Sequence, residues 1–231
     1  MPIGAGSSQW WRLLAYGEPG TGKTVLAGTA PNSIMLEADQ GDKSAAMAGS
    51  TAKKWTLRDW DDAENALDWL MFEGHKEFDI CTFDTITMFQ YSGLTQIMEE
   101  LVIAKPTRKV WQVDRGEYGQ NMARLERYVR KLTELPMHIL MTAHVLESVD
   151  HEGETRYMPR VQGKDMPDKI CSYFDLVGHM HMVVKDGEER PRLSTRKEGK
   201  YYAKDRYGVI GVMGDPTMPK IIERIEKAQQ G

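Results

Sequence analysis

Short apolar runs and amphipathic stretches follow one another along most of this chain. The clearest apolar runs, each predicted to be a buried strand, are at residues 12–16, 34–36, 78–84 and 137–143. Helical spacing of apolar side chains and helix start signals predict helices at residues 23–29, 59–72, 92–103 and 120–135. Strands that alternate with helices in this way favour an α/β fold, with a mostly parallel sheet between helices.

The last third of the chain has a different pattern. Residues 149–168 are polar and rich in Gly and Pro, which predicts a loop or a hairpin. A short helix is expected at residues 169–176, strands at 177–184, 192–195 and 199–204, and a charged helix at 220–229. These late strands predict an antiparallel C-terminal extension at one edge of the sheet. We find no internal repeat and no linker, so residues 10–231 are predicted to be one domain behind a flexible Gly/Ser-rich N-terminal arm at residues 1–9.

Composition narrows the class of protein without fixing its function. The 231 residues are 41% hydrophobic and 28% charged, which is typical of a globular protein. A net charge of −4 argues against general coating of nucleic acid but leaves room for a local basic groove. No apolar run approaches the ~18 residues of a membrane span, and no signal-peptide pattern opens the chain, so we expect a cytoplasmic protein with no membrane partner. Cys81 and Cys171 are expected to be reduced core residues.

Residues 17–24 fit the pattern G-x-x-x-x-G-K-[ST] of a phosphate-binding loop, the P-loop or Walker A motif. Glycines let the backbone turn tightly and point N–H groups at phosphate oxygens, and a following helix directs its positive dipole end at the same oxygens. Lys23 can reach the β- and γ-phosphates of ATP, and the Thr24 hydroxyl can ligate Mg²⁺. The residues expected to surround the nucleotide are Gly17, Glu18, Pro19, Gly20, Thr21, Gly22, Lys23, Thr24 and Val25.

Hydrolysis of Mg²⁺-ATP needs carboxylates beyond the loop. Asp84 closes an apolar strand, where P-loop enzymes place a metal-side Asp, so it is predicted to complete the Mg²⁺ site. Glu37 and Asp39 follow the strand at residues 34–36, which we expect to lie beside the P-loop strand. One of them is predicted to orient the attacking water, with Asp39 preferred to Glu37; helix capping is the alternative for both.

Two further polar features stand where they could act on the γ-phosphate. His144 ends the strand at residues 137–143 and could sense the nucleotide, although a structural role is equally open. Lys204 and Arg206 are one residue apart on a chain expected to be extended, so their side chains should point the same way. Such a pair could grip a phosphate from outside, as arginine fingers do, or could be a solvated strand end.

Taken together, the P-loop, the acidic strand end at residues 36–41, the strand at 78–85, residues 138–144 and residues 202–208 resemble the RecA-like P-loop ATPases. The chain is most similar to the small phage ATPases of the single-strand-annealing recombinase group, over residues 13–211. The resemblance implies that Asp39 stands where that family carries a catalytic Glu, and that His144 replaces a γ-phosphate-sensing Gln. It also implies that Lys204 and Arg206 act on the ATP of a neighbouring subunit, and therefore that the chain forms a homo-oligomeric ring or filament.

The resemblance further implies two loops that bind single-stranded DNA, at residues 105–119 and 147–168. Cations interleaved with aromatic rings suit a single strand, because phosphates meet the charges while bases stack on the rings. The candidate DNA-binding residues are Lys105, Arg108, Lys109, Trp111, Arg115, Arg156, Tyr157, Arg160 and Lys164. An ordinary charged surface is the alternative, because acidic residues are interspersed in both loops.

The expected function is therefore a DNA-dependent ATPase of DNA recombination that promotes annealing or strand exchange. It would act in the host cytoplasm if the chain is phage-encoded, and a single-strand-binding protein is a further candidate partner. A nucleotide-gated DNA-binding or loader protein with little ATP turnover is the alternative. A small-molecule kinase is disfavoured, because the chain has no Arg-rich lid segment.

Overall fold

The structure is a computed structural model that describes residues 10–38, 46, 49–149 and 152–229. Asp39 and the predicted arm at residues 1–9 lie outside these ranges. The strands are β1 (Arg12–Gly17), β2 (Ser33–Glu37), β3 (Lys53–Thr56), β4 (Ile80–Asp84), β5 (His138–Val149), β6 (Thr155–Pro159), β7 (Leu176–Lys185), β8 (Glu188–Ser194), β9 (Lys204–Asp205) and β10 (Val212–Gly214). The helices are α1 (Lys23–Gly28), α3 (Trp60–Trp69), α4 (His75–Glu77), α5 (Ile86–Ala104), α6 (Arg115–Thr133), α7 (Met166–Ser172) and α8 (Met218–Gln229), with a π-helical turn at Leu70–Gly74.

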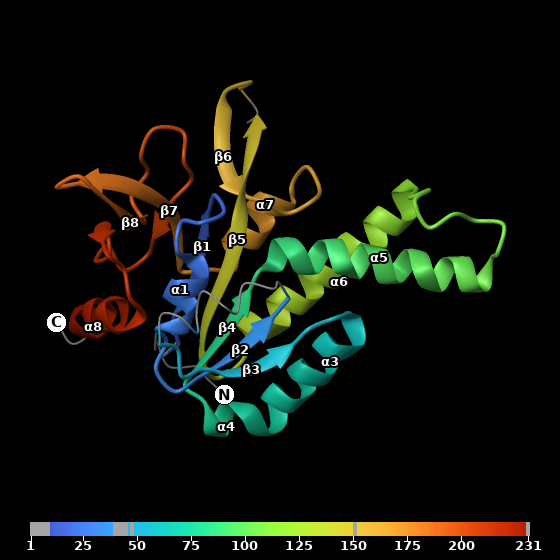
Figure 1. The fold of residues 1–231 in the computed structure, drawn as a ribbon, viewed down its shortest axis with the longest axis horizontal. Coiled ribbons are helices and arrows are strands. Elements are labelled where there is room, and N and C mark those ends of the chain that lie inside the picture. The colour runs from blue at the N-terminus through green and yellow to red at the C-terminus, as the bar shows by residue number, and fades with distance from the viewer. Residues whose placement is uncertain (1–9, 39–45, 47–48, 150–151, 230–231) are drawn as a thin grey trace, which may run out of the picture.

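One sheet joins all the described strands, in the order β10-β8-β7-β1-β5-β4-β2-β3, with β6 paired to β5 and β9 to β7 (Figure 1). The six strands from β7 to β3 are parallel, whereas β8, β9 and β10 pair antiparallel. The predicted α/β class, with a mostly parallel sheet and an antiparallel C-terminal extension, is confirmed. This is the sheet of a RecA-like P-loop NTPase.

The expected position of the second strand was wrong. β2 pairs with β3 and β4, so β4 and β5 separate it from β1. The reason lies in the connection: α1 packs against both β4 and β5, and so carries the chain past the places that these two strands fill. Apolar periodicity identifies a buried strand but does not say which buried strand lies beside it.

Several element boundaries also moved, each for a local reason. β5 continues six residues past the predicted end at 143, because its extension pairs with β6 to form a hairpin. α6 starts at Arg115 instead of 120, because Asp114 and Glu117 form a capping box that outweighs the nearby glycines. α5 begins at Ile86 with the Thr85 side chain as its cap, and α7 begins at Met166, three residues before the predicted start. The strand predicted at 199–204 is reduced to β9.

Each face of the sheet carries its own core. On one face, Trp60, Phe83, Phe89 and Tyr128 form an aromatic cluster beneath α3, α5 and α6, with Trp60 and Phe89 edge to face at 4.7 Å. On the other face, α1 and α8 cover a core that includes Ile221 of α8 (Figure 1). Burial of each such side chain contributes about 1.5–3 kcal/mol. These two layers hold the carboxyl ends of β1, β4 and β5 in place, where the predicted site residues lie.

None of the described helices combines the length and the apolarity that a transmembrane span needs.

Two helical glycines offer a matched test of the packing between α5 and α3. A Cβ at Gly93 would lie 2.5 Å from Nε1 of buried Trp60 and 3.0 Å from Oδ1 of Asn121, whereas a Cβ at Gly116 meets nothing within 4 Å. We expect Gly93→Ala to lower the free energy of unfolding by about 1–3 kcal/mol through overpacking. Gly116→Ala should leave it unchanged or raise it by up to about 1 kcal/mol through helix propensity. Urea denaturation checks both, and equal stability of the two variants would contradict this packing.

His138 predicts a pH dependence of stability. Its ring stacks on Trp11 at 4.5 Å and its Nδ1 accepts a hydrogen bond from the Trp11 amide, and burial lowers its pKa to about 4. The unfolded chain, with a His pKa near ~6.5, takes up a proton in this window that the folded chain does not. The free energy of unfolding should therefore fall as pH falls from about 6.5 to about 4. His138→Phe should make that fall smaller in urea titrations at pH 7.5 and pH 5, and an unchanged difference would contradict the assignment.

Candidate functional site

The P-loop is held between two neighbouring strands. β1 ends at Gly17, which is level with His144 on β5 and Met180 on β7. A Cβ at Gly17 would overlap the Met180 carbonyl oxygen, so only glycine fits this close approach. Gly22, which precedes α1, has a φ of 87°, in the left-handed region that glycine adopts without strain. The loop therefore turns directly from a buried strand into the N-terminus of α1, as the sequence pattern predicted.

Lys23 is buried and lies back across the loop. Its Nζ donates hydrogen bonds to the carbonyl oxygens of Gly17, at 3.0 Å, and Glu18, at 2.8 Å. The Thr21 hydroxyl also donates to the Glu18 carbonyl, at 2.8 Å. The ammonium group is thus held over the mouth of the loop, where it can bind phosphate oxygens together with the loop amides.

Asp84 is the centre of the site. It ends β4, is 1% exposed, and accepts a hydrogen bond at Oδ2 from the Thr24 hydroxyl, at 2.7 Å. Its Oδ1 accepts from the hydroxyl of Thr142, which is fully buried on β5. A carboxylate beside a P-loop threonine is the donor set that Mg²⁺ prefers, so Thr24 and Asp84 fit the predicted metal site.

Sequence reasoning missed Thr142. The sequence did contain an indication, because Thr142 is a polar residue between apolar residues of β5. Alternation along the strand turns its side chain to the same face as Leu140. That face carries α1, so Thr142 and Thr24 both reach Asp84 on this side of the sheet.

Glu37 lies in the same site. It is the register partner of Asp84 on neighbouring β2, and register partners of adjacent strands share a face of the sheet. Its side chain is 8% exposed. The structure therefore brings one of the two candidate water-orienting carboxylates beside the predicted metal ligand, while Asp39 lies outside the described residues.

His144 stands level with the first glycine of the P-loop. Its amide donates to the Thr87 hydroxyl at 3.0 Å, and its carbonyl accepts from the Arg160 amide at 2.7 Å. Thr87, near the start of α5, in turn donates to the Arg160 carbonyl at 2.8 Å. His144 thus joins the P-loop edge of the sheet to the base of the β5–β6 hairpin, which suits the predicted sensor position.

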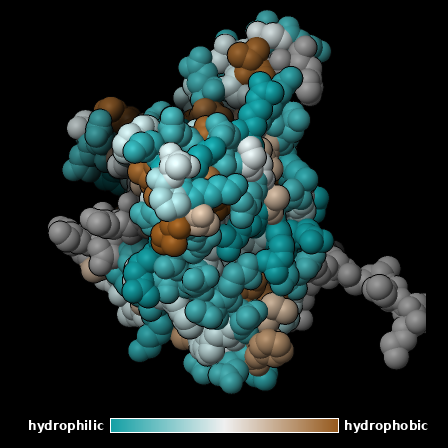
Figure 2. Space-filling view, turned by 90° about the vertical axis from the view of Figure 1, so that its right-hand side faces the viewer, coloured by the Kyte–Doolittle hydropathy of each residue, from teal (hydrophilic) through white to brown (hydrophobic). Residues whose placement is uncertain are grey.

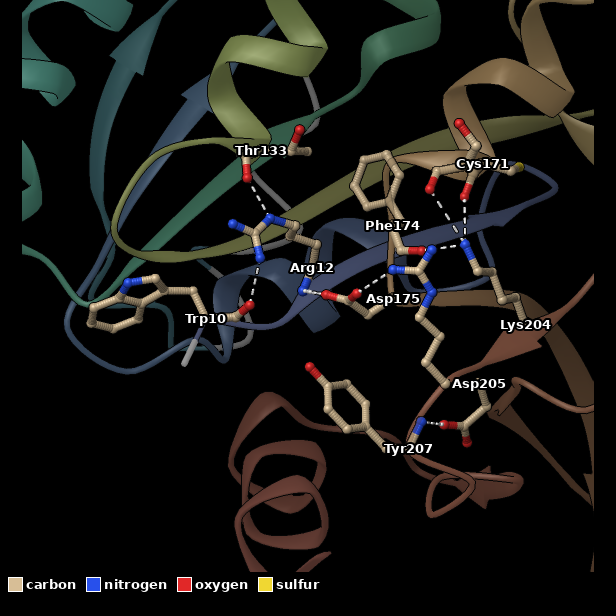
Figure 3. Close-up of polar contacts among 11 residues, drawn as sticks. Trp10, Arg12, Thr133, Cys171, Phe174, Asp175, Lys204, Asp205 and Tyr207 are labelled. Carbon is tan, nitrogen blue, oxygen red and sulfur yellow. Dashed lines mark hydrogen bonds and ion pairs between the residues drawn. The ribbon is translucent and has the colours of Figure 1, made fainter. Parts of the chain in front are cut away.

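Lys204 and Arg206 converge on the segment that connects α7 to β7, and Figure 3 shows Lys204 there beside Phe174 and Asp175. The Lys204 Nζ donates to the carbonyl oxygens of Cys171, Ser172 and Phe174, the last at 2.6 Å. Arg206 forms an ion pair with Asp175 at 3.0 Å. Burial and the neighbouring Arg206 lower the pKa of Lys204.

The two cations lie far from the P-loop of their own chain along the strand direction. Lys204 pairs with Val177 on β7, which is level with Leu14, whereas the P-loop begins at Gly17, at the other end of β1. Both side chains point the same way, as predicted, while Asp205 between them accepts hydrogen bonds from the amides of Tyr207, Gly208 and Ile210. The structure does not bring them together with Lys23 within one chain.

The candidate DNA-binding residues fall on two separate projections (Figure 1). At the α5–α6 tip, Trp111 is 75% exposed, and Arg108 is ion-paired with Asp114 and Glu117. The side chains of Lys105, Lys109 and Arg115 are exposed there and form no ion pair within the described ranges.

The second projection, the β5–β6 hairpin, uses several of its candidates internally. Arg156 is ion-paired with Asp168, and the Arg160 Nε donates to the Val145 carbonyl. The Tyr157 ring stacks on Tyr201 at 4.6 Å. Lys164, beyond the hairpin, is exposed.

Comparison with known proteins finds a matching family and similar solved structures. The sequence matches the AAA domain family over residues 9–207. No curated protein matches the sequence. Similar solved structures include the flagellar accessory protein FlaH from Methanocaldococcus jannaschii, at 11% identity, 93% coverage of both chains and a TM-score of 0.42. A KaiC-like protein from Pyrococcus horikoshii OT3 is similar at 14% identity, 89% coverage of both chains and a TM-score of 0.48.

Thr142 gives the sharpest test of the site. Thr142→Val keeps the shape of the side chain but removes the hydroxyl that fixes Asp84. Loss of an outer-shell partner of a metal ligand typically costs about 10–100-fold in metal affinity or activity. We therefore expect the Mg²⁺ concentration for half-maximal ATP hydrolysis to rise at least about 10-fold, whereas Thr142→Ser should stay near the wild-type value. Identical Mg²⁺ titrations for the Val and Ser variants would contradict this role.

Proposed function

The chain belongs to the AAA domain family and is a RecA-like P-loop ATPase, and on that premise we propose that it uses ATP hydrolysis to act on single-stranded DNA. The proposed activity is that of a DNA recombination protein, which promotes annealing or strand exchange as a homo-oligomer. ATP and Mg²⁺ are the proposed cofactors.

The contact of Thr24 with Asp84 is the observation that best supports ATP hydrolysis. Main-chain amides of the P-loop and Lys23 would hold the triphosphate, while Thr24 and Asp84 would hold Mg²⁺, which neutralises charge on the phosphates. Glu37 is the described carboxylate in position to orient water, and His144 is proposed to sense the nucleotide. Asp39 keeps its proposed role as the alternative water-orienting residue.

The tip where α5 ends and α6 begins, at residues 105–119, supports the proposed binding of DNA. Its three exposed cations, Lys105, Lys109 and Arg115, lie near Trp111 in the sequence, and this combination of charge with an exposed aromatic ring suits phosphates and unstacked bases. Figure 2 shows that the face on that side of the molecule is largely hydrophilic, with hydrophobic side chains in small separate spots. At the tip itself, Ile103, Val110 and Trp111 are exposed beside the cations, so the tip offers apolar as well as charged groups to a nucleic acid strand.

The position of Lys204 and Arg206 supports a shared ATP site. They lie at the end of the sheet opposite to their own P-loop, so they would reach a triphosphate only in a neighbouring copy. Arg206 is 56% exposed and is held in direction by Asp175, which suits a cation that is presented outward. A ring or a filament would repeat this contact from copy to copy.

The first experiment measures ATP hydrolysis with and without single-stranded DNA at low salt. We expect the DNA to increase turnover several-fold and Lys23→Ala to abolish turnover in both conditions, because the phosphate-binding ammonium is lost. Nucleotide binding without turnover would favour the loader alternative. If the protein does not bind DNA and DNA does not stimulate ATP hydrolysis, the proposed action on single-stranded DNA is wrong.

Mixing two inactive variants tests the shared site. Lys23→Ala lacks a working P-loop, and Arg206→Ala lacks the cation proposed to act on the neighbour. In a mixed oligomer, an intact P-loop can meet an intact Arg206, so a 1:1 mixture should recover part of the wild-type ATP turnover. A merely structural role of the Arg206–Asp175 ion pair would give no recovery, and that result would overturn the shared site.

A further inference from the structure

A cavity of about 480 Å³ lies beside the β5–β6 hairpin. One wall is the hairpin, with Glu152, Glu154 and Arg156, and the other is the segment at residues 197–203, between β8 and β9. Sequence reasoning gave Lys197 and Lys200, on this segment, no function. The volume lies in the range of small-ligand sites, about 300–1,000 Å³.

The two walls are fixed to each other by main-chain hydrogen bonds and by ring stacking. The Tyr157 amide donates to the Lys200 carbonyl, and the Tyr202 amide donates to the Tyr157 carbonyl, both at 2.9 Å. Tyr201 stacks on Tyr157 at an interplanar angle of 21°. The buried Tyr16 hydroxyl is bonded to the Tyr202 carbonyl, at 2.6 Å. The part of the cavity lined by residues 200–202 is therefore fixed to the hairpin and to the sheet.

The charges on the rim are unevenly placed. Lys197 and Lys200 are exposed on one wall, and neither side chain forms an ion pair within the described part of the chain. On the hairpin wall, Arg156 is ion-paired with Asp168, and Glu152 and Glu154 contribute two carboxylates. Positive charge that is available to an anion thus comes mainly from the two lysines.

We propose that this cavity is a subsite for single-stranded DNA, in which Lys197 and Lys200 bind the phosphodiester backbone. The inference rests on the proposed function and extends its DNA contacts to a segment outside the two predicted loops. Lysine ammonium groups on one wall suit phosphates, while the Glu carboxylates of the other wall can accept hydrogen bonds from exocyclic amino groups of bases. An acidic protein segment would also meet the lysines, but it lacks the exocyclic amino groups of bases that the two carboxylates can bind.

The position of the cavity connects it to the ATP site. The Tyr201 ring, which contributes to its wall, stacks on His179 at 3.7 Å, and His179 packs against Tyr16. Tyr16 directly precedes the first glycine of the P-loop. A DNA strand in the cavity would therefore press on rings that contact the nucleotide-binding strand itself, which gives a physical route for DNA to affect hydrolysis.

The test is the Lys197→Ala/Lys200→Ala double variant of the full chain, compared with wild type and with a Lys53→Ala/Lys185→Ala control. The control removes the same charge from exposed lysines on β3 and β7, outside the cavity lining. Fluorescence anisotropy with a labelled oligothymidine measures affinity at several salt concentrations, and ATP hydrolysis without DNA monitors the intact fold.

We expect the cavity variant to bind about 10-fold more weakly and to have a salt slope smaller by about 1.4, which is the loss of two single-strand phosphate contacts at about 0.7 each. The control variant should match wild type, and DNA-free ATP hydrolysis should be unchanged in both. If wild type binds the oligonucleotide and the cavity variant binds equally well, this inference is overturned while the proposed function stands. If wild type does not bind, both fail. A change in oligomeric state without a change in DNA affinity would assign the cavity to a subunit contact and also overturn the inference.

Discussion

The carboxylate of Asp84 is the constraint on which the site depends. It is buried, and it takes hydroxyl donors from Thr24 on α1 and Thr142 on β5, so three separate elements meet at one charged group. A buried carboxylate that lost either donor would be left with an unmet acceptor, which costs about 1–3 kcal/mol or more for a charged group. The spacing of the P-loop helix above the sheet is therefore set by hydrogen bonding as well as by apolar packing.

The two ends of the parallel sheet have different chemistry. The carboxyl ends of β1, β2, β4 and β5 gather the P-loop, Glu37, Asp84 and His144, as expected for an open α/β sheet. At the opposite end, Lys204 and Arg206 bind to the connection between α7 and β7. In the proposed shared ATP site, the cations at one end of a protomer would meet the triphosphate held at the other end of the next protomer. Such a contact is head-to-tail.

Much of this arrangement could be predicted from the sequence, because the responsible signals are local. The P-loop has a fixed spacing of Gly, Lys and Thr, and Asp84 ends an unmistakable apolar strand, so both were found. The order of the strands could not be predicted, because no local sequence pattern shows that the connection through α1 passes β4 and β5 before the chain forms β2. Thr142 was missed because a buried threonine shows its role only when its partner on another strand is known. The intrachain contacts of Arg108, Arg156 and Arg160 were equally invisible, because they depend on tertiary neighbours.

The close approach of Gly17 to the Met180 carbonyl has a mechanical consequence. No gap separates the P-loop backbone from β7 at this point, so the two cannot slide past one another without a clash. Pro191, on β8, also faces Gly22, so the β7–β8 ribbon lies against the loop at two points. A displacement of that ribbon would therefore press directly on the nucleotide-binding turn.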